Sequence, residues 1–504
     1  MPGYVLGTDN GCTMSKAALF TVDGREIAVA SQKTETLTPR PGHLERHVPE
    51  MWAATAAVVK QVIAQAGIDP ADIACVAPTG HGNGLYLVDE AGQPVCNAIM
   101  STDSRARDII DEWTAEGVGD AVRPKAMQAI WPAQPGALLQ WLKRHQPEVL
   151  AQARWVLMAK DFIRLQLTGE AAAEVTDFSG TGLLNNATGD YDAELLEAYG
   201  IADLRRLLPP LVLTADLCGE VTARAAAETG LAEGTPVAGG MFDIDASGLA
   251  TGLVDETQLC TIAGTWGNNQ YIARTPVVSP HVYMSSRYCI PGYYLMLEGS
   301  PTSASNLEWF VSEFLGAERA LAEGEGGSVY ELCNELVAAT PPEDADIVFL
   351  PFLYGSNVDR DAKAALVGLN GWHGRGHVLR AIYEGVVFAH RTHVDRLLRF
   401  RDMPDTIRLT GGASRSDVWA QIFADVFQTP VEIPAGTELG ALGAAIAASV
   451  ACGAHPSYEQ AVAAMVRVAR RQDPDPTTRD LYQAKYARSQ AVIDALGPAW
   501  GAFA

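Results

Sequence analysis

Residues 5–16 read VLGTDNGCTMSK, and residues 259–273 read LCTIAGTWGNNQYIA. In each stretch an apolar, strand-forming run breaks at a Gly-Thr pair, crosses a short polar turn and resumes as a strand. Glycine lets backbone N–H groups approach an anion closely, and Thr and Ser hydroxyls add neutral donors. We therefore expect two hairpins that face a phosphate, about half a chain apart, as in a duplicated domain.

The order of the predicted elements also repeats. In the first half we expect strands at 4–8, 16–22 and 25–31, a helix at 49–66 and a strand at 73–78. In the second half we expect a hairpin at 258–274, strands near 282–297, a helix at 303–315 and a strand at 407–412 that enters a helix. Three strands, then helices, then a further strand, found twice, predict a duplicated α/β domain and not one doubly wound sheet.

The remaining segments complete this predicted organisation. We place the hinge between residues 240 and 258, in VAGGMFDIDASGLATG. Residues 316–345 are rich in Glu, Gly and Ala and predict a surface helix and loop. The Ala-rich segment 439–451 predicts a packed helix, and residues from 455 onward predict terminal helices.

Composition excludes several classes of function. The 504 residues include 37 Lys and Arg against 60 Asp and Glu, a formal charge of −23, so a nucleic-acid partner is not expected. The eight cysteines form no Cys-x-x-Cys pair and indicate reduced thiols. The N-terminus lacks a signal peptide, and no apolar stretch reaches the roughly 18 residues of a membrane span. We expect a cytoplasmic protein without a membrane partner.

Carboxylates stand at two of these turns. Asp9 ends the first strand beside the phosphate hairpin, where one or two carboxylates suit Mg²⁺, although an Asp that only caps the turn fits equally well. Asp243 begins a small-residue helix after Gly239-Gly240, where a carboxylate would accept the proton of a hydroxyl that attacks a phosphate. Asp245 competes for this role, and either residue fits helix N-capping.

Further loops carry polar groups. TGGASRSDVWAQIFAD, residues 410–425, is a third glycine turn between a strand and a helix, suited to an anion but also typical of a tight connection. His81 follows a strand into a Gly-rich loop. Asp103 and Arg105 suit polyol hydroxyls, or form a surface salt bridge with each other. The histidine pairs 373/377 and 390/393 have near metal-ligand spacing but lack a partner set, so no histidine-bound metal is expected.

Taken together, these segments resemble the FGGY family of carbohydrate kinases from end to end. AALVGLNGWHGRGHVLRAIYE, residues 364–384, fits the family's C-terminal signature at its constrained positions, and KDFIRLQLTGE and TDFSGTGLLN, at 160–170 and 176–185, resemble its first domain. The resemblance implies a duplicated actin-like ATPase (ribonuclease H-like) α/β fold. Its two lobes would be an N-terminal domain, 1–246, on the sugar and phosphate side and a C-terminal domain, 247–504, on the nucleotide side, with a central cleft.

The resemblance also assigns roles, with ATP and Mg²⁺ as cofactors and a homodimer as the family expectation. It implies Asp243 as the catalytic base, in preference to Asp245, and Asp9 with Asp243 near the metal. The implied nucleotide and phosphate contacts are Thr13, Lys16, Gly264, Thr265, Ala304, Glu308, Gly411, Gly412 and Ser416. The implied sugar contacts are His81, Gly82, Asn83, Asp103, Arg105 and Asp243.

Departures from the family pattern narrow the range of expected substrates. The pair Ser356-Asn357 stands where D-xylulose kinases have Glu-Arg, and Trp266 follows Gly264-Thr265 where those kinases have Ser. The segment at 300–310 reads SPTSASNLEWF. All three features resemble L-xylulose (3-keto-L-gulonate) kinases. Leu138 replaces a usual Lys, and Cys12 a usual Thr. We expect phosphorylation of a ketopentose, L-xylulose or a related ketose such as D-xylulose, at its terminal hydroxyl. The alternatives are a kinase of another sugar or polyol, such as ribulose or gluconate, or a non-catalytic actin-like ATPase.

Overall fold

The computed structural model describes residues 3–356, 358 and 361–503, so Asn357 of the substrate-narrowing segment lies outside the described residues. The chain packs into two compact units. Unit 1 contains residues 1–254, 272–296 and 436–467, and unit 2 contains residues 255–271, 297–435 and 468–504. The domain boundary expected between residues 246 and 247 stays a prediction, and packing assigns the later segment 436–467 to unit 1.

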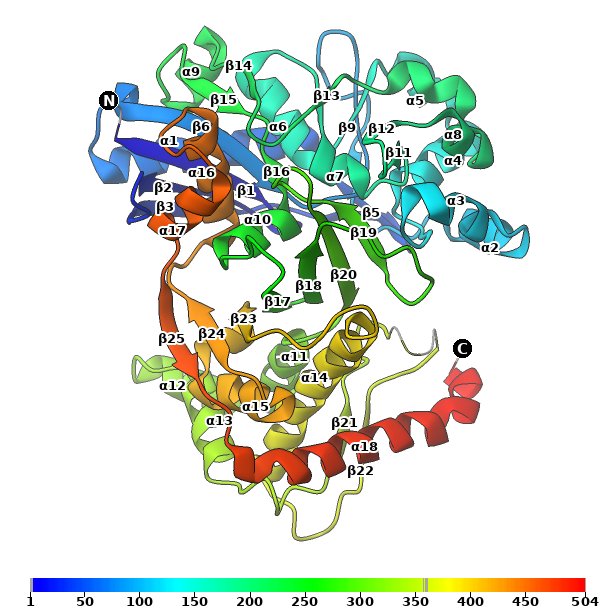
Figure 1. The fold of residues 1–504 in the computed structure, drawn as a ribbon, viewed down its shortest axis with the longest axis vertical. Helices are drawn as coiled ribbons and strands as arrows, with labels where there is room; N and C mark the ends of the chain where they lie inside the picture. Colours follow the sequence, from blue (N-terminus) through cyan, green and yellow to red (C-terminus); the bar gives the residue numbers. More distant parts are fainter. Residues whose placement is uncertain (1–2, 357, 359–360, 504) are drawn as a thin grey trace. The chain divides into compact units, whose positions relative to one another are not determined.

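Unit 1 is built on a mixed sheet with the strand order β14-β15-β6-β1-β2-β3, in which β16 also pairs with β6 (Figure 1). Its strands are β1 (Tyr4–Asn10), β2 (Met14–Thr21), β3 (Glu26–Lys33), β6 (Ile73–Gly80), β14 (Leu217–Glu220), β15 (Pro236–Ala238) and β16 (Met241–Phe242). Strands β1, β2 and β3 form an antiparallel meander, whereas β6 runs parallel to β1 and β15 parallel to β6. Helix α1 (Val48–Ala66) covers β2 and β3 with its apolar face.

The second sheet has the order β19-β20-β18-β17-β23-β24-β25. Its strands are β17 (Gln258–Ala263), β18 (Gly267–Ala273), β19 (Met284–Arg287), β20 (Tyr294–Ser300), β23 (Thr406–Thr410), β24 (Val431–Pro434) and β25 (Val468–Gln472). β17 and β18 are antiparallel, β23 runs parallel to β17, and β24 runs parallel to β23. Helices α14 (Arg375–Leu397) and α15 (Asp417–Phe427) pack against each other in unit 2.

The two sheets repeat one topology. The order β3-β2-β1-β6-β15 in the first corresponds to β20-β18-β17-β23-β24 in the second, and each contains an antiparallel hairpin followed by two parallel neighbours. This is the duplicated α/β domain that the repeated order of elements predicted, with the actin-like, ribonuclease H-like fold that the family resemblance implied. Both predicted hairpins are present as β1-β2 and β17-β18.

The Ala-rich helix α16 (Leu439–Ala451) lies against β1 and against α10 (Asp243–Ala250) in unit 1 (Figure 1). Small residues allow this close approach, because a Cβ atom added at Gly7 would lie 1.9 Å from the carbonyl oxygen of Ala441. A Cβ atom added at Gly443 would likewise lie 2.1 Å from the carbonyl oxygen of Ala246. The prediction of a packed helix at 439–451 is therefore confirmed. Among the described residues, no helix combines the length and apolar character needed to cross a membrane.

Two predictions about the C-terminal half are wrong in part. The tail after residue 455 contains the strand β25 between its helices, because Val468–Gln472 forms an exposed sheet edge whose charged side chains carry no apolar alternation. Residues 316–345 form two helices, α12 (Gly316–Gly324) and α13 (Val329–Ala338). Helix α13 is not merely a surface element, since it buries Val329, Cys333 and Val337.

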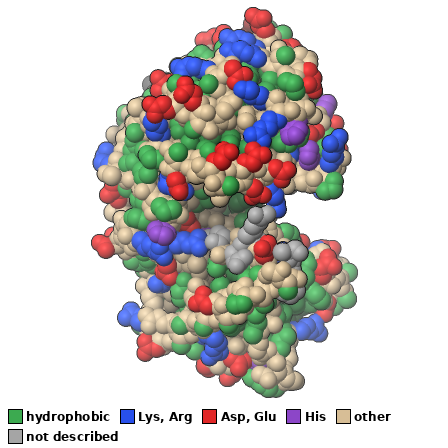
Figure 2. All heavy atoms as spheres, turned by 90° about the vertical axis from the view of Figure 1, so that its right-hand side faces the viewer, with side chains coloured by type: hydrophobic (Ala, Val, Ile, Leu, Met, Phe, Trp, Pro, Cys, Tyr) green, Lys and Arg blue, Asp and Glu red, His purple; other side chains and the backbone are tan. Residues whose placement is uncertain are grey.

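The surface is acidic overall, in keeping with the formal charge of −23. Figure 2 shows one face, on which acidic side chains are spread out with basic side chains between them.

The contact between α16 and α10 gives a test of the fold. Replacing Gly443 with Ala puts a methyl group against the Ala246 carbonyl, and overpacking of this kind costs about 1–3 kcal/mol. Gly443→Ala is expected to lower the free energy of unfolding by that amount in denaturant titrations. Gly3→Ala is the matched control, because no atom lies within 4 Å of a Cβ added there. Equal stabilities of the two variants would contradict the close packing.

Candidate functional site

The hairpin β1-β2 carries Asp9 beside its turn, and Asp9 pairs in register with Lys16 on β2. Burial raises the pKa of Asp9 to about 6; the Lys16 charge lowers it, and the Glu438 charge raises it. Lys16 forms an ion pair with Glu438 (Nζ to Oε2, 2.7 Å), the residue before α16. Thr13 is exposed at the turn, and its carbonyl oxygen accepts a hydrogen bond from the N–H of Thr34.

Asp243 is the first residue of α10, as predicted. The N-cap of α10 is Phe242, which makes no side-chain cap, so neither Asp243 nor Asp245 is the N-cap. The N–H of Phe242 donates to Oγ1 of Thr176 at 3.0 Å, which fixes the backbone directly before Asp243. Burial raises the pKa of the Asp243 carboxyl well above its ordinary value, and the like charge of Asp9 raises it further.

Asp245 has a different environment, although it stands only two residues later. Its side chain is fully buried, and Oδ1 accepts a hydrogen bond from the N–H of Cys289 at 3.1 Å. The carboxylate therefore holds a neighbouring loop of unit 1 in place. Asp243 is largely buried as well, but unlike Asp245 it retains some exposed surface, so it is the more accessible of the two residues.

A buried ionic network lies in the same unit. Lys160 is fully buried and lies 2.9 Å from Asp161, 3.4 Å from Glu174 and 3.6 Å from Asp177. Glu174 accepts a 2.7 Å hydrogen bond from the Thr176 hydroxyl that also receives the Phe242 N–H. Burial raises the pKa of Asp177 to about 8, and the charge of Asp177 in turn raises the pKa of Asp243. The network thus supports the start of α10 both sterically and electrostatically.

The predicted sugar loop follows β6, as expected. His81 Nε2 lies 2.9 Å from the Tyr86 hydroxyl, and burial lowers the pKa of His81 to about 3, so its ring is neutral. Among the described residues, neither His81 Nδ1 nor Asn83 Oδ1 has a hydrogen-bond partner, although both atoms are buried. A Cβ atom at Gly82 would lie 2.2 Å from the Phe242 ring, so this loop packs beside the residue that precedes Asp243.

Asp103 and Arg105 form an ion pair with each other at 2.9 Å. The alternative prediction, a salt bridge between these two residues, is therefore confirmed. Its expected position on the surface is wrong, because the side chains of Asp103 and Arg105 are only 0% and 3% exposed. Arg105 also contacts Glu45 at 2.8 Å, and Asp103 Oδ2 accepts the N–H of Leu44. The pair thus joins two loops, and its contact with a sugar stays a prediction.

Unit 2 contains a cavity of about 830 Å³, a volume typical of small-molecule sites. Six of the seven nucleotide-side residues predicted for this unit line it: Gly264, Thr265, Ala304, Glu308, Gly412 and Ser416. Gly411 does not line the cavity. It has a positive φ of 88°, and a Cβ atom there would lie 2.5 Å from the carbonyl carbon of Ala263, so Gly411 allows the turn to pass close to β17.

Sequence reasoning missed the aromatic wall of this cavity. Tyr383 stacks on Trp419 with a 4.2 Å separation between ring centroids, and both line the cavity. The Tyr383 hydroxyl and the Ser416 hydroxyl both donate to Oδ1 of Asn334, at 2.9 and 2.6 Å. These residues come from helices α13, α14 and α15, and only the fold brings the three helices to one cavity.

Glu308 lines the same cavity, and two other side chains donate hydrogen bonds to its carboxylate. Its carboxylate accepts hydrogen bonds from the Tyr330 hydroxyl and from Arg319, the latter at 2.8 Å. Tyr330 also lines the cavity. A ligand that hydrogen-bonds to Glu308 would therefore meet a carboxylate already oriented by two donors.

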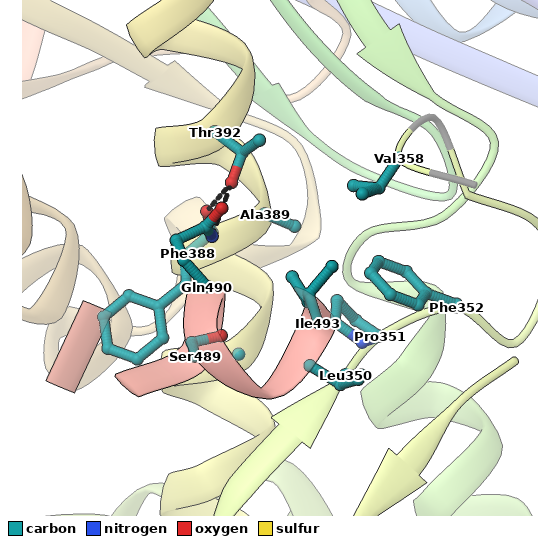
Figure 3. A pocket seen from close by; sticks show the side chains of 11 residues that line it. Leu350, Pro351, Phe352, Val358, Phe388, Ala389, Thr392, Ser489, Gln490 and Ile493 are labelled. Atoms are coloured by element: carbon teal, nitrogen blue, oxygen red, sulfur yellow. Dashed lines mark hydrogen bonds between the residues drawn. The ribbon is translucent and has the colours of Figure 1, made fainter. Parts of the chain in front are cut away.

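A second cavity of unit 2 is too small for an organic ligand. It lies between α14 and α18 (Arg479–Leu496), where Gln490 donates to the Thr392 hydroxyl at 3.2 Å (Figure 3). Its volume is about 10 Å³, close to the space of a single water molecule, and its walls are mostly apolar. The 830 Å³ cavity is thus the one of these two that suits a nucleotide.

The paired histidines have protein partners. His390 bridges Ser303 and Asn269, with 2.8 Å from Nε2 to the Ser303 hydroxyl and 3.0 Å from Nδ1 to the Asn269 amide oxygen. His373 lies 2.8 Å from Asp346, and its ring packs on Trp372. Within the described ranges no group of three or more His, Cys, Asp or Glu side chains has the geometry of a metal site.

The comparisons with known proteins agree with this geometry. Residues 4–250 match the N-terminal domain of the FGGY family of carbohydrate kinases, and residues 259–452 match its C-terminal domain. The chain belongs to the FGGY family of carbohydrate kinases. It is therefore a kinase, a phosphotransferase that acts on a sugar-type substrate.

Individual relatives cover nearly the whole chain. It is 39% identical to the L-xylulose/3-keto-L-gulonate kinase of Escherichia coli K12 over 98% of both chains. It is 35% identical to a probable L-xylulose kinase of Pasteurella multocida, over 98% of this chain and 99% of the relative. The crystal structure of xylulose kinase from Rhodospirillum rubrum superposes with a TM-score of 0.88 at 30% identity, covering 99% of this chain and 100% of that one.

Burial of His390 gives a pH-dependent prediction. Burial lowers the pKa of His390 from about 6.5 to about 3, so as pH falls from 6.5 to 3 the unfolded chain gains a proton that the folded chain does not. The free energy of unfolding therefore falls as the pH falls through that range, by up to about 1.4 kcal/mol per pH unit for one buried imidazole. His390→Gln is expected to make the free energy of unfolding of unit 2 fall less steeply below pH 6.5.

The measurement is denaturant unfolding at a series of pH values between 4 and 8. His47→Gln, which replaces an exposed histidine, is the control and should retain the wild-type slope. A slope for His390→Gln that matches the wild type would show that this imidazole is not held neutral in the folded protein.

Proposed function

We propose that this kinase uses ATP to phosphorylate the terminal hydroxyl of a ketopentose, with L-xylulose as the preferred substrate. The observation that carries the proposal is Asp243, a partly exposed carboxylate at the start of α10 whose pKa is raised by burial and by the nearby charge of Asp9. Two L-xylulose kinase relatives, at 39% and 35% identity over 98% of this chain, support the sugar. The proposed substrate class is thus a five-carbon ketose.

In the proposed reaction the sugar hydroxyl attacks the terminal phosphorus of ATP. The bond between that phosphorus and the oxygen bridging it to ADP breaks, ADP leaves, and Asp243 receives the hydroxyl proton. In this proposal Asp243 orients the hydroxyl and receives its proton as the new bond to phosphorus forms. Positioning of the two reactants supplies most of the remaining acceleration.

Asp9 and Asp243 fit a divalent cation. Their like charges raise the pKa of Asp243, and a hard cation between oxygen donors would relieve that repulsion. Mg²⁺ typically binds through one or two carboxylates together with phosphate oxygens and water, so two Asp side chains suffice. When bound, the ion would neutralise charge on the phosphates. Asp9, in this proposal, holds the ion, and Asp243 orients the sugar hydroxyl.

The nucleotide and the sugar would use separate residues. The 830 Å³ cavity of unit 2 offers the Tyr383–Trp419 pair, the polar Asn334 and the Gly412 turn to a nucleoside and its phosphates. In unit 1 the unpaired buried atoms His81 Nδ1 and Asn83 Oδ1 are suited to sugar hydroxyls, because a buried polar atom without a partner is costly unless a ligand satisfies it. Asp103 and Arg105 complete the proposed sugar side.

Lys16 and Thr13 have supporting roles in this proposal. Lys16 is held by Glu438, so its charge would act on a phosphate from a fixed position at the hairpin. Thr13 is exposed at the turn, and in this proposal its hydroxyl donates to a phosphate oxygen. Because all eight cysteines are free thiols, we also propose that the protein is located in the reducing environment of the cytoplasm. A homodimer stays an expectation from the family resemblance.

The two Asp residues of α10 provide a matched test of the base. Asp243→Asn removes the proton acceptor with little change in shape, and loss of a general base typically costs about 10²–10⁴-fold in kcat. Asp245→Asn is the control, since Asn retains an oxygen that can accept the Cys289 N–H. L-xylulose-dependent ADP release is expected to fall at least about 100-fold in Asp243→Asn and to stay within about tenfold in Asp245→Asn.

Nucleotide affinity should be nearly unchanged in both variants, because neither residue lies in the cavity of unit 2. If Asp243→Asn kept a turnover within a few-fold of wild type, Asp243 would not be the base. If wild-type protein released ADP with another sugar or polyol but not with L-xylulose, the proposed substrate would be wrong while the kinase reaction stood.

A further inference from the structure

Arg46 is the last residue of β5 (His43–Arg46), and its side chain runs into the interior of unit 1 beside the phosphate hairpin. Only 1% of the residue is exposed. One guanidinium nitrogen donates to the carbonyl oxygen of Gly11 at 3.0 Å, and the other donates to the carbonyl oxygen of Cys12. A third, weaker contact reaches the Met51 sulfur at 3.6 Å. The guanidinium is thus bound to the turn of the hairpin.

The charge of Arg46 is not neutralised by an ion pair within the part of the chain that the structure describes. The adjacent Glu45 pairs with Arg105 instead, at 2.8 Å. The groups that act electrostatically on Cys12 are Asp243, Arg46 and Asp9, so Cys12 lies near both the Arg46 cation and the two carboxylates. Burying a cation without a carboxylate partner destabilises the folded state. Here the hydrogen bonds to two backbone carbonyls offset part of that destabilisation.

The contacts of Arg46 determine the direction of the hairpin amides. In a planar trans peptide the C=O of one residue and the N–H of the next point in opposite directions. Because the carbonyls of Gly11 and Cys12 point at the buried guanidinium, the N–H groups of Cys12 and Thr13 point away from it. No described group accepts a hydrogen bond from either N–H. Two successive amides that lack an acceptor are donors suited to an anion.

We propose that Arg46 is a positioning residue for phosphate binding. Its guanidinium anchors the carbonyls of Gly11 and Cys12, and this orients the N–H groups of Cys12 and Thr13 toward the terminal phosphate of ATP. The inference rests on the proposed function, since it takes ATP as the ligand of the hairpin. It also accounts for Cys12 at a turn position where the family usually has Thr: the backbone amide binds the phosphate, so a side-chain hydroxyl is not required.

The test compares the affinities of variants for AMP-PNP, which keeps a terminal phosphate, and for ADP, which lacks it, by isothermal titration calorimetry. Arg46→Met fills similar space without the donors. It is expected to bind AMP-PNP about tenfold more weakly, the effect of losing one hydrogen bond to a charged group, and to bind ADP with unchanged affinity. Arg46→Lys keeps the charge but replaces the two-pronged guanidinium with a single ammonium group, so its AMP-PNP affinity is expected to lie clearly below that of wild type and above that of Arg46→Met.

Arg206→Gln is the matched control, because the Arg206 guanidinium also binds two backbone carbonyls of unit 1, those of Ala153 and Leu150. It should leave both affinities unchanged. A merely structural role for Arg46 would lower the melting temperature and the active fraction without changing the ratio of the two affinities. An unchanged ratio in Arg46→Met overturns the proposal.

If Arg46→Met does not fold, Arg46→Lys decides the question. An AMP-PNP affinity below that of wild type with an unchanged ADP affinity supports the proposal, and wild-type affinities for both overturn it. The binding experiment needs no sugar, so it is distinguishable from a failure of the proposed function. A wild-type protein that binds AMP-PNP but phosphorylates no ketose would contradict the substrate and leave the Arg46 result standing.

Discussion

The structure of unit 1 depends on the close packing of helix α16 against both β1 and α10. Gly7, Gly440 and Gly443 make this possible, since a Cβ atom at Gly440 would lie 2.5 Å from a carboxylate oxygen of Asp9 and one at Gly443 would lie 2.1 Å from the Ala246 carbonyl. A single helix therefore contacts the strand that carries Asp9 and the helix that begins with Asp243. Larger side chains on α16 would separate the two elements.

This packing has an electrostatic consequence. Two carboxylates come close enough for the charge of Asp9 to raise the pKa of Asp243, and burial raises the pKa of both. The buried network around Lys160 and Asp177 holds the start of α10 in place from the other side, through Thr176 and the Phe242 N–H. Such an arrangement costs stability, because like charges are held together out of water. Proteins typically retain a destabilising pair of carboxylates at sites that bind a cation or a proton.

Sequence reasoning predicted the elements that glycine turns and apolar periodicity specify. Both hairpins, helix α1, the packed helix α16 and the start of α10 at Asp243 lie where they were expected. The residue pattern alone left Asp243 and Asp245 open, and the preference for Asp243 came from the family resemblance. Strand β25 was missed because an exposed edge strand of charged residues lacks an apolar period. Arg46 and the Tyr383–Trp419 pair were missed because their partners come from segments distant in the sequence. The roles of the site residues stay predictions.

The central claim is that the carboxylates of unit 1 direct the terminal phosphate of ATP to a ketopentose and not to water. The most direct measurement is ³¹P NMR of the wild-type reaction with ATP, Mg²⁺ and L-xylulose, beside parallel reactions with D-xylulose, L- and D-ribulose and 3-keto-L-gulonate. The account predicts one sugar phosphomonoester for each ADP formed, fastest with L-xylulose, and little inorganic phosphate when sugar is omitted. Release of inorganic phosphate at the same rate with and without every sugar would contradict it and indicate an ATPase.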